Sequence, residues 1–240
     1  MIDLTPRQIQ ILRAIIDEFI ETAEPVGSET IDKKYNIGVS PATIRNEMVQ
    51  LTKQGYLYKP HSSAGRMPTP QAMRLYVNEL VKERSLTVAD EISAKERIWE
   101  SRKNLDHLMK SIAQVLAEKT QSLGLALLDD EEVFHSGYAN LLNMPEFHDI
   151  NVIRNVLQLI EQTRLVDDIF DSSESENQIQ VIYGAELGNR DLEPISIIYT
   201  SCTVQGHTCR VGALGSARFD YTYVLPMMKY IRKLMEEIVE

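Results

Sequence analysis

The chain has 240 residues, 43% of them hydrophobic and 25% charged, which is typical of a globular protein with a sizeable core. No apolar run approaches the about 20 residues that a membrane-spanning helix needs, and the first residues do not resemble a secretory signal. Two cysteines, Cys202 and Cys209, are too few for a disulfide framework. A cytoplasmic protein is therefore expected.

The formal net charge of −10 is unevenly distributed. Residues 1–84 hold 11 Lys and Arg against 10 Asp and Glu, whereas residues 85–240 hold 14 against 25. Within 33–74 the single acidic residue is Glu47, and the basic residues are Lys33, Lys34, Arg45, Lys53, Lys59, Arg66 and Arg74. Such a local basic excess can form a nucleic-acid-binding surface, although charge alone would favour an ordinary solvated surface.

Three helices are predicted at the start of the chain. Residues 5–8, Thr-Pro-Arg-Gln, have the pattern of a capping box and open a helix that must end before Pro25. Ser28 can cap a second, short helix that runs to about Asn36. Ser40 and the proline after it open a third helix, which ends before Gly55.

The third helix has two distinct faces. With Ile44, Met48 and Leu51 facing the core, the helical repeat places Ala42, Arg45, Asn46, Val49 and Lys53 outside, with Thr43 at the flank. A β-hairpin follows, with a strand over 56–59, a turn over 62–65 and an edge strand from Arg66 onward. Another helix begins at Thr69-Pro70. Helix, helix, helix, hairpin and helix is the order of a winged helix-turn-helix.

This arrangement predicts a DNA-binding site. An arginine fits guanine and an asparagine fits adenine, so we expect Arg45 and Asn46 to contact bases while Thr43 and Lys53 orient the helix. The hairpin is expected to lie on phosphates or in the minor groove through Lys59, His61, Ser63 and Arg66. The plainer alternatives are a generic surface helix and a merely polar turn.

Residues 86–120 contain no Gly or Pro and predict one long helix. Ile98, Leu105 and Ile112 fall seven residues apart, with Leu108 and Val115 beside them. This spacing suits either a dimer seam or packing against the next domain, and the sequence does not choose between them.

From Leu123 onward the pattern is mixed α/β. Strands are expected over 123–128, 133–136, 179–184, 195–204 and 209–214, and helices over 152–162 and 221–240. The last two strands form a hairpin about Gln205 and Gly206, and 167–177 is an acidic, serine-rich loop. The expected fold class is therefore α+β, with a boundary near residue 84 and another near residue 122.

No catalytic or metal-binding constellation is apparent. The five histidines are scattered, and Cys202, His207 and Cys209 are the closest approach to a cluster. A two-residue turn would place the cysteines opposite each other, most simply as reduced thiols. We expect no enzyme activity, no cofactor and no metal.

Several segments carry a resemblance to a known family. "LTPRQIQILRAIIDEFIETAEPVGSETI", "GVSPATIRNEMVQLTKQGYLYKPHSSAGRMPT" and "RLYVNEL" closely resemble the N-terminal domain of the heat-inducible transcription repressor family, HrcA. "SGYANLLNMPEF" and "VGALGSARFDYTYVLP" resemble its C-terminal region. The resemblance implies a homodimeric repressor of chaperone operons that binds an inverted-repeat operator known as CIRCE. It also implies a GAF-like domain with an inserted dimerising domain, and a chaperonin as a further partner.

The chain departs from the family pattern in two places. The family has a much longer stretch between residues 120 and 136, so this chain is a shortened member without much of the central region. Where the family tends to have Gly-Pro-x-Arg-Met, residues 215–219 read Gly-Ser-Ala-Arg-Phe. The expected division is a winged helix over 1–84, a connecting or dimerising helix over 85–122, and a truncated GAF-like domain over 123–240.

Two rival functions remain open. The second domain could sense a small molecule and control other genes, which a thermal-shift ligand screen would detect. Alternatively the acidic domain could dock a chaperone while the chain contacts DNA only weakly, in which case Arg45→Ala would cost little function.

Overall fold

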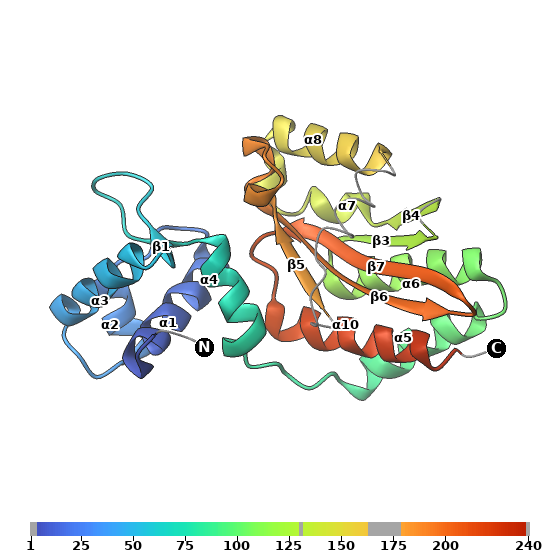
Figure 1. Cartoon of the computed structure of the whole chain (residues 1–240), viewed down its shortest axis with the longest axis horizontal. Coiled ribbons are helices and arrows are strands. Elements are labelled where there is room, and N and C mark those ends of the chain that lie inside the picture. The colour runs from blue at the N-terminus through green and yellow to red at the C-terminus, as the bar shows by residue number, and fades with distance from the viewer. Residues whose placement is uncertain (1–3, 130–131, 163–178, 239–240) are drawn as a thin grey trace. The chain divides into compact units, whose positions relative to one another are not determined.

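The computed structural model describes residues 4–129, 132–162 and 179–238, so the predicted acidic loop over 167–177 lies outside it. The chain divides into two compact units, Met1–Lys82 and Glu83–Glu240, each with its own core (Figure 1).

The first unit is helical with a small hairpin. Its elements are α1 (Pro6–Thr22), α2 (Ser28–Tyr35), α3 (Pro41–Lys53), β1 (Leu57–Tyr58), β2 (Met67–Pro68), α4 (Pro70–Leu75) and the π-helical turn η1 (Tyr76–Leu80). This is the predicted order of elements. Ile15 of α1, Ile31 of α2 and Ile44 of α3 are completely buried, so the three helices share one core.

Three of the four predicted helix starts are confirmed. The hydroxyls of Thr5, Ser40 and Thr69 each accept a backbone N–H from the first turn of the helix that follows. The prediction for Ser28 is wrong, because Gly27 occupies the cap position and Ser28 is a buried first residue of α2 without a capping bond.

The prediction of one long helix over 86–120 is also wrong. Two helices, α5 (Val88–Glu100) and α6 (Leu105–Thr120), pack together, and Arg97 of α5 pairs with Glu118 of α6. The break needs no Gly or Pro, because the side chain of Asn104 accepts the His107 N–H and starts α6 (2.9 Å).

The apolar repeat in this region belongs to the core of the second unit. Ile98, Leu108 and Ile112 are completely buried, and Val115 is almost so. Packing within the chain, one of the two alternatives left open by the sequence, therefore accounts for these residues.

The second unit is built on a five-stranded antiparallel sheet, which makes the fold α+β. The strands are β3 (Leu123–Leu128), β4 (Glu132–Ser136), β5 (Gln180–Tyr183), β6 (Ile195–Val204) and β7 (His207–Ser216), in the order β4-β3-β7-β6-β5. Short connections are formed by α7 (Tyr138–Leu141), η2 (Pro145–His148), η3 (Gly184–Glu186) and η4 (Arg190–Leu192).

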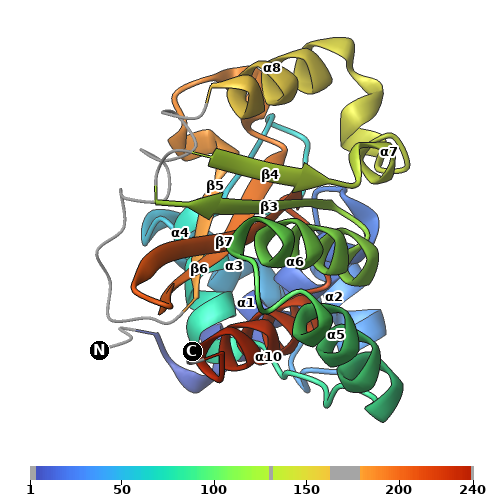
Figure 2. The same cartoon turned by 90° about the vertical axis from the view of Figure 1, so that its right-hand side faces the viewer.

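Helices cover both faces of this sheet (Figure 2). On one face, α6 and α10 (Tyr221–Glu236) pack on the central strands, and Gly124 lets the backbone of β3 approach that of α6. On the other face, α8 (Ile150–Glu161) packs on the side chains of β3 that point away from α6, such as Leu125. Within the described residues, no helix is long and apolar enough to cross a membrane.

The β6–β7 hairpin confirms the predicted turn. Gln205 and Gly206 both have positive φ (51° and 84°), as a two-residue turn requires, and Cys202 lies directly opposite Cys209. Both thiols are free. Burial raises the pKa of Cys202 to about 12 and that of Cys209 to about 11, so both thiols stay protonated at neutral pH.

Asp90 ties three helices of the second unit together. Its carboxylate accepts hydrogen bonds from the Thr87 hydroxyl (2.7 Å), the Lys119 ammonium (3.1 Å) and the Tyr223 hydroxyl (3.1 Å). These donors, Thr87 first, lower the pKa of Asp90 to about 2.

We therefore expect Asp90→Asn to destabilise the second unit by about 1–2 kcal/mol at pH 7. The folded pKa lies below the ordinary value of 3.8, so this contribution is complete above about pH 4 and is lost as the pH falls through about 2. Urea unfolding followed by the fluorescence of Trp99 at pH 7, 4 and 2 measures it. Glu96→Gln, also on α5 but exposed, is the control, and a deficit that persisted undiminished at pH 2 would contradict the assignment.

Candidate nucleic-acid interface

The outward face of α3 is the first part of the candidate interface. Its three predicted core residues are buried, whereas Arg45, Asn46 and Lys53 are exposed. No hydrogen bond or ion pair with the described part of the chain engages these three polar side chains. They are therefore available to an external ligand.

The acidic residue of α3 lies away from this face. Glu47 lies next to Arg7 of α1, with 3.6 Å between the Arg7 guanidinium and the Glu47 carboxylate. Since successive residues of a helix are about 100° apart, Glu47 points well away from Arg45 and Lys53. The acid-free face explains how a strongly acidic chain can offer a surface to an anion.

The hairpin is attached to the rest of the first unit by backbone pairing. Val26, in the loop between α1 and α2, exchanges two hydrogen bonds with Arg66, each 2.9 Å long. Gly65 allows this approach, because a Cβ atom there would lie 2.4 Å from the Val26 carbonyl oxygen. The hairpin thus gains a third, very short strand partner.

A side-chain bond joins the hairpin to α3. The Arg66 Nε donates to the Thr52 hydroxyl (3.0 Å), and that hydroxyl donates in turn to the Met48 carbonyl (2.8 Å). Arg66 is half-buried as a result. It therefore serves as much to position the hairpin against α3 as to face a ligand.

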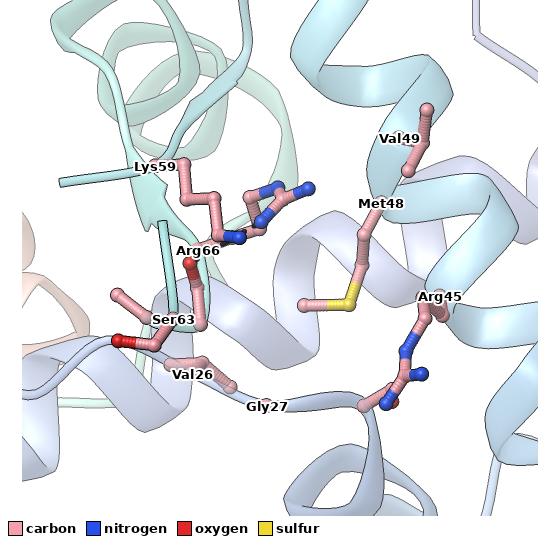
Figure 3. Close-up of a pocket in the computed structure, with 11 residues that line it drawn as sticks. Val26, Gly27, Arg45, Met48, Val49, Lys59, Ser63 and Arg66 are labelled. Atoms are coloured by element: carbon pink, nitrogen blue, oxygen red, sulfur yellow. Dashed lines mark hydrogen bonds between the residues drawn. The ribbon is translucent and has the colours of Figure 1, made fainter. Parts of the chain in front are cut away.

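Between α3 and the hairpin lies a recess of about 400 Å³ (Figure 3). Arg45 lines it from α3, and Lys59, Ser63 and Arg66 line it from the hairpin, while none of its eleven lining residues is acidic. Its floor includes Gly27, where α2 begins. The unpaired N–H groups of a helix start favour an anion, so backbone and side chains here have the same electrostatic preference.

The eight predicted site residues fall into four groups. The recess takes in Arg45, Lys59, Ser63 and Arg66, whereas Asn46 and Lys53 lie on the exposed face of α3 outside it and His61 is exposed in the hairpin loop. Thr43 is held in the cap of α3, where its N–H donates to the Ser40 hydroxyl (3.2 Å).

Sequence reasoning missed the residues that shape the recess. Val26, Thr52 and Gly65 position the hairpin, and although Gly65 falls in the predicted turn, no charge marks any of the three as part of a site. The sequence also counted Lys34 among the basic residues of the surface, but its ammonium is bound by Glu18 (2.7 Å) and Glu21 (2.6 Å) of α1. These carboxylates raise the pKa of Lys34 above its ordinary value and neutralise its charge locally.

The clustered histidine and cysteine residues do not form a second site. Cys202 and Cys209 face each other at the hairpin end of the sheet, and His207 pairs instead with Asp129. Among the residues that the structure describes, no group of three His, Cys, Asp or Glu side chains is arranged to hold a metal.

A helical unit with an acid-free basic recess, joined to a unit with an antiparallel sheet, defines an α+β protein with a candidate nucleic-acid-binding surface. A family model described as the HrcA protein C-terminal domain matches residues 44–225. The chain belongs to the HrcA family.

Relatives match over nearly the whole chain. The heat-inducible transcription repressor HrcA of Pelotomaculum thermopropionicum is 27% identical over 338 residues, with 99% of this chain and 97% of that protein covered. That of Geobacter sulfurreducens is 24% identical, with 100% and 99% covered. The relatives carry the name of a transcription repressor, in agreement with the expectation that the chain is not an enzyme.

The first of these alignments confirms that the chain is a shortened member. Its 338 positions exceed the 240 residues of the chain by 338 − 240 = 98, so at least that many positions of the relative have no counterpart here. A crystal structure of a hypothetical protein shares the fold, with a TM-score of 0.73, 21% identity, and 98% of this chain and 99% of that one covered.

We expect Gly65→Ala to displace the hairpin, because the new methyl group would meet the backbone of Val26 rather than a flexible side chain. The first unit should lose about 2 kcal/mol of stability, the usual cost of overpacking. Urea unfolding followed by far-UV circular dichroism measures the loss. Gly27→Ala, where the nearest atom to a new Cβ is 3.9 Å away, is the matched control, and equal stability of the two variants would contradict the close approach.

Proposed function

We propose that the chain represses transcription by binding an inverted-repeat operator of the CIRCE type as a homodimer. The observation that carries this proposal is the acid-free surface formed by α3 and the hairpin recess. The names of its relatives, which are heat-inducible transcription repressors, support the same function. Such a protein acts in the cytoplasm, where bacterial DNA lies.

In this proposal the first unit is a winged helix-turn-helix over 1–84. The β-bridge between Val26 and Arg66 supports it, since it adds a third strand to the hairpin that forms the wing. Helix α3 enters the major groove, where Arg45 reads guanine and Asn46 reads adenine. The side chain of Lys53 contacts a phosphate, and Thr43 orients the start of the helix through its cap.

The wing has a separate task. Lys59, His61 and Ser63 lie in the hairpin and face the backbone of the DNA, and Arg66 holds the hairpin against α3 while its guanidinium lines the recess. A phosphate group fits this recess, because three cationic side chains and a helix start surround it.

The second unit regulates or assembles the repressor. The proposed division is a connecting segment over 85–122 and a truncated GAF-like domain over 123–240. An antiparallel sheet with helices on both faces supports the GAF-like assignment. A chaperonin is the proposed regulatory partner, by resemblance to the family.

We expect Arg45→Ala to weaken binding to an inverted-repeat duplex by about 10- to 100-fold, because a bidentate contact to guanine contributes about 1–3 kcal/mol. A scrambled duplex should lose much less. Fluorescence anisotropy of labelled duplexes over a salt series measures both affinities and their salt slopes. Arg154→Ala, an exposed arginine of α8, removes the same charge from the other unit and is the control.

Two results would count against this reading. An equal loss of affinity for both duplexes would mean that Arg45 contacts phosphates rather than bases. If the wild-type chain distinguishes the two duplexes and Arg45→Ala binds each of them as well as the wild-type chain does, the outward face of α3 does not contact DNA.

A further inference from the structure

Helix α5 has an exposed apolar face that nothing in the described chain covers. Its inner face is buried through Ala94 and Ile98, which are fully inaccessible. Farther round the helix, Val88 is 71% exposed and Ile92 is 52% exposed. Figure 2 shows α5 at the outer side of the layer that it forms with α6 and α10.

Together with the exposed Lys95 and the half-buried Trp99, these two residues follow the spacing of a helix-pairing seam. Val88, Ile92, Lys95 and Trp99 are separated by four, three and four residues, which is the spacing of successive d and a positions in a heptad. They therefore form one stripe along three turns of α5. A stripe of this spacing packs against a second helix that lies nearly parallel or antiparallel to it.

Two opposite charges accompany the stripe without forming an ion pair within the described residues. The Lys95 ammonium lies over the ring of Trp99, 5.4 Å from its centre. The Glu91 backbone carbonyl accepts the Tyr230 hydroxyl (3.1 Å), and no ion pair within the described residues engages the Glu91 carboxylate. One chain thus offers an unpaired carboxylate and an unpaired ammonium one helical turn apart.

The two ends of the stripe differ in shape. At the start of α5 there is an open recess of about 470 Å³ whose lining includes Leu86, Glu91 and Tyr230. At the other end stands the large indole of Trp99, the single tryptophan of the chain. A bulky group at one end and a recess at the other match only when the second helix runs in the opposite direction.

We propose that α5 is a self-association surface, on which two copies of this chain pair antiparallel about a two-fold axis. Val88 of each copy then lies opposite Trp99 of the other, and Ile92 lies opposite the methylene stem of Lys95. The Lys95 ammonium of each copy reaches Glu91 of the other, which gives two equivalent ion pairs. Each contact therefore occurs twice, with the two copies exchanged, as a two-fold interface requires.

The surface is modest in size. A pair of 13-residue helices buries less than the about 800 Å² per partner of a standard interface, so the dimer should form at micromolar concentrations rather than nanomolar ones. The proposed operator binding needs a two-fold complex, but α5 pairing is testable without DNA, so either proposal can fail while the other stands.

The first test is sedimentation velocity of the full chain from 1 to about 100 µM, without DNA. Dimers are expected, and Ile92→Glu should raise the dissociation constant at least about tenfold, because it buries an unpaired charge at the seam. Leu142→Glu is the matched control, since Leu142 is similarly exposed (57%) but lies outside α5. A monomeric wild-type chain at 100 µM, or equal losses in the two variants, would overturn the proposal.

The second test uses the charges and does not depend on core packing. The Glu91→Lys variant has positive charges at both positions 91 and 95, and the Lys95→Glu variant has negative charges at both. Like charges would then face each other across the seam, so each variant alone should self-associate poorly. Mixed in equal amounts, they should form a heterodimer with both ion pairs restored, accompanied by a blue shift of Trp99 emission. Absence of heterodimers in the mixture, where the wild-type chain dimerises, would overturn the antiparallel arrangement.

Discussion

The candidate interface depends on one close backbone contact, the pairing of Val26 with Arg66. Two short hydrogen bonds attach the hairpin to the loop before α2, and the absence of a side chain at Gly65 permits the approach. Without this contact, β1 and β2 would form only a two-residue ladder, which is too short to hold its position alone. The contact places the loop, the hairpin and α3 around one recess.

Electrostatic separation within the first unit complements this geometry. The unit is nearly neutral by residue count, yet three of its carboxylates are engaged away from the recess: Glu18 and Glu21 hold Lys34, and Glu47 lies by Arg7. A weak overall charge therefore conceals a locally positive surface. The strongly acidic second unit adds to the net charge of the chain without contributing to the lining of the recess.

Local signals in the sequence were sufficient where short-range physics decides the structure. The caps at Thr5, Ser40 and Thr69, the buried face of α3 and the turn at Gln205 each depend on residues within four positions of one another. The sequence failed at the break between α5 and α6, because an asparagine cap and a buried apolar face together can end a helix without Gly or Pro. Long-range contacts such as Arg66 with Thr52, 14 residues apart, leave no local pattern.

The mistaken prediction of one long helix over 86–120 also bears on how the chain could assemble. The heptad spacing of Ile98, Leu105 and Ile112 crosses a turn. Ile98 and Ile112 are buried in the core of one chain, and Leu105 is half-buried. A second 4-3-4 pattern on α5, through Val88, Ile92, Lys95 and Trp99, passes unnoticed in the sequence because a lysine interrupts it. Once the buried face of α5 is known, the remaining apolar face stands out. Burial by the chain's own core thus decides which of two overlapping repeats is available to a partner.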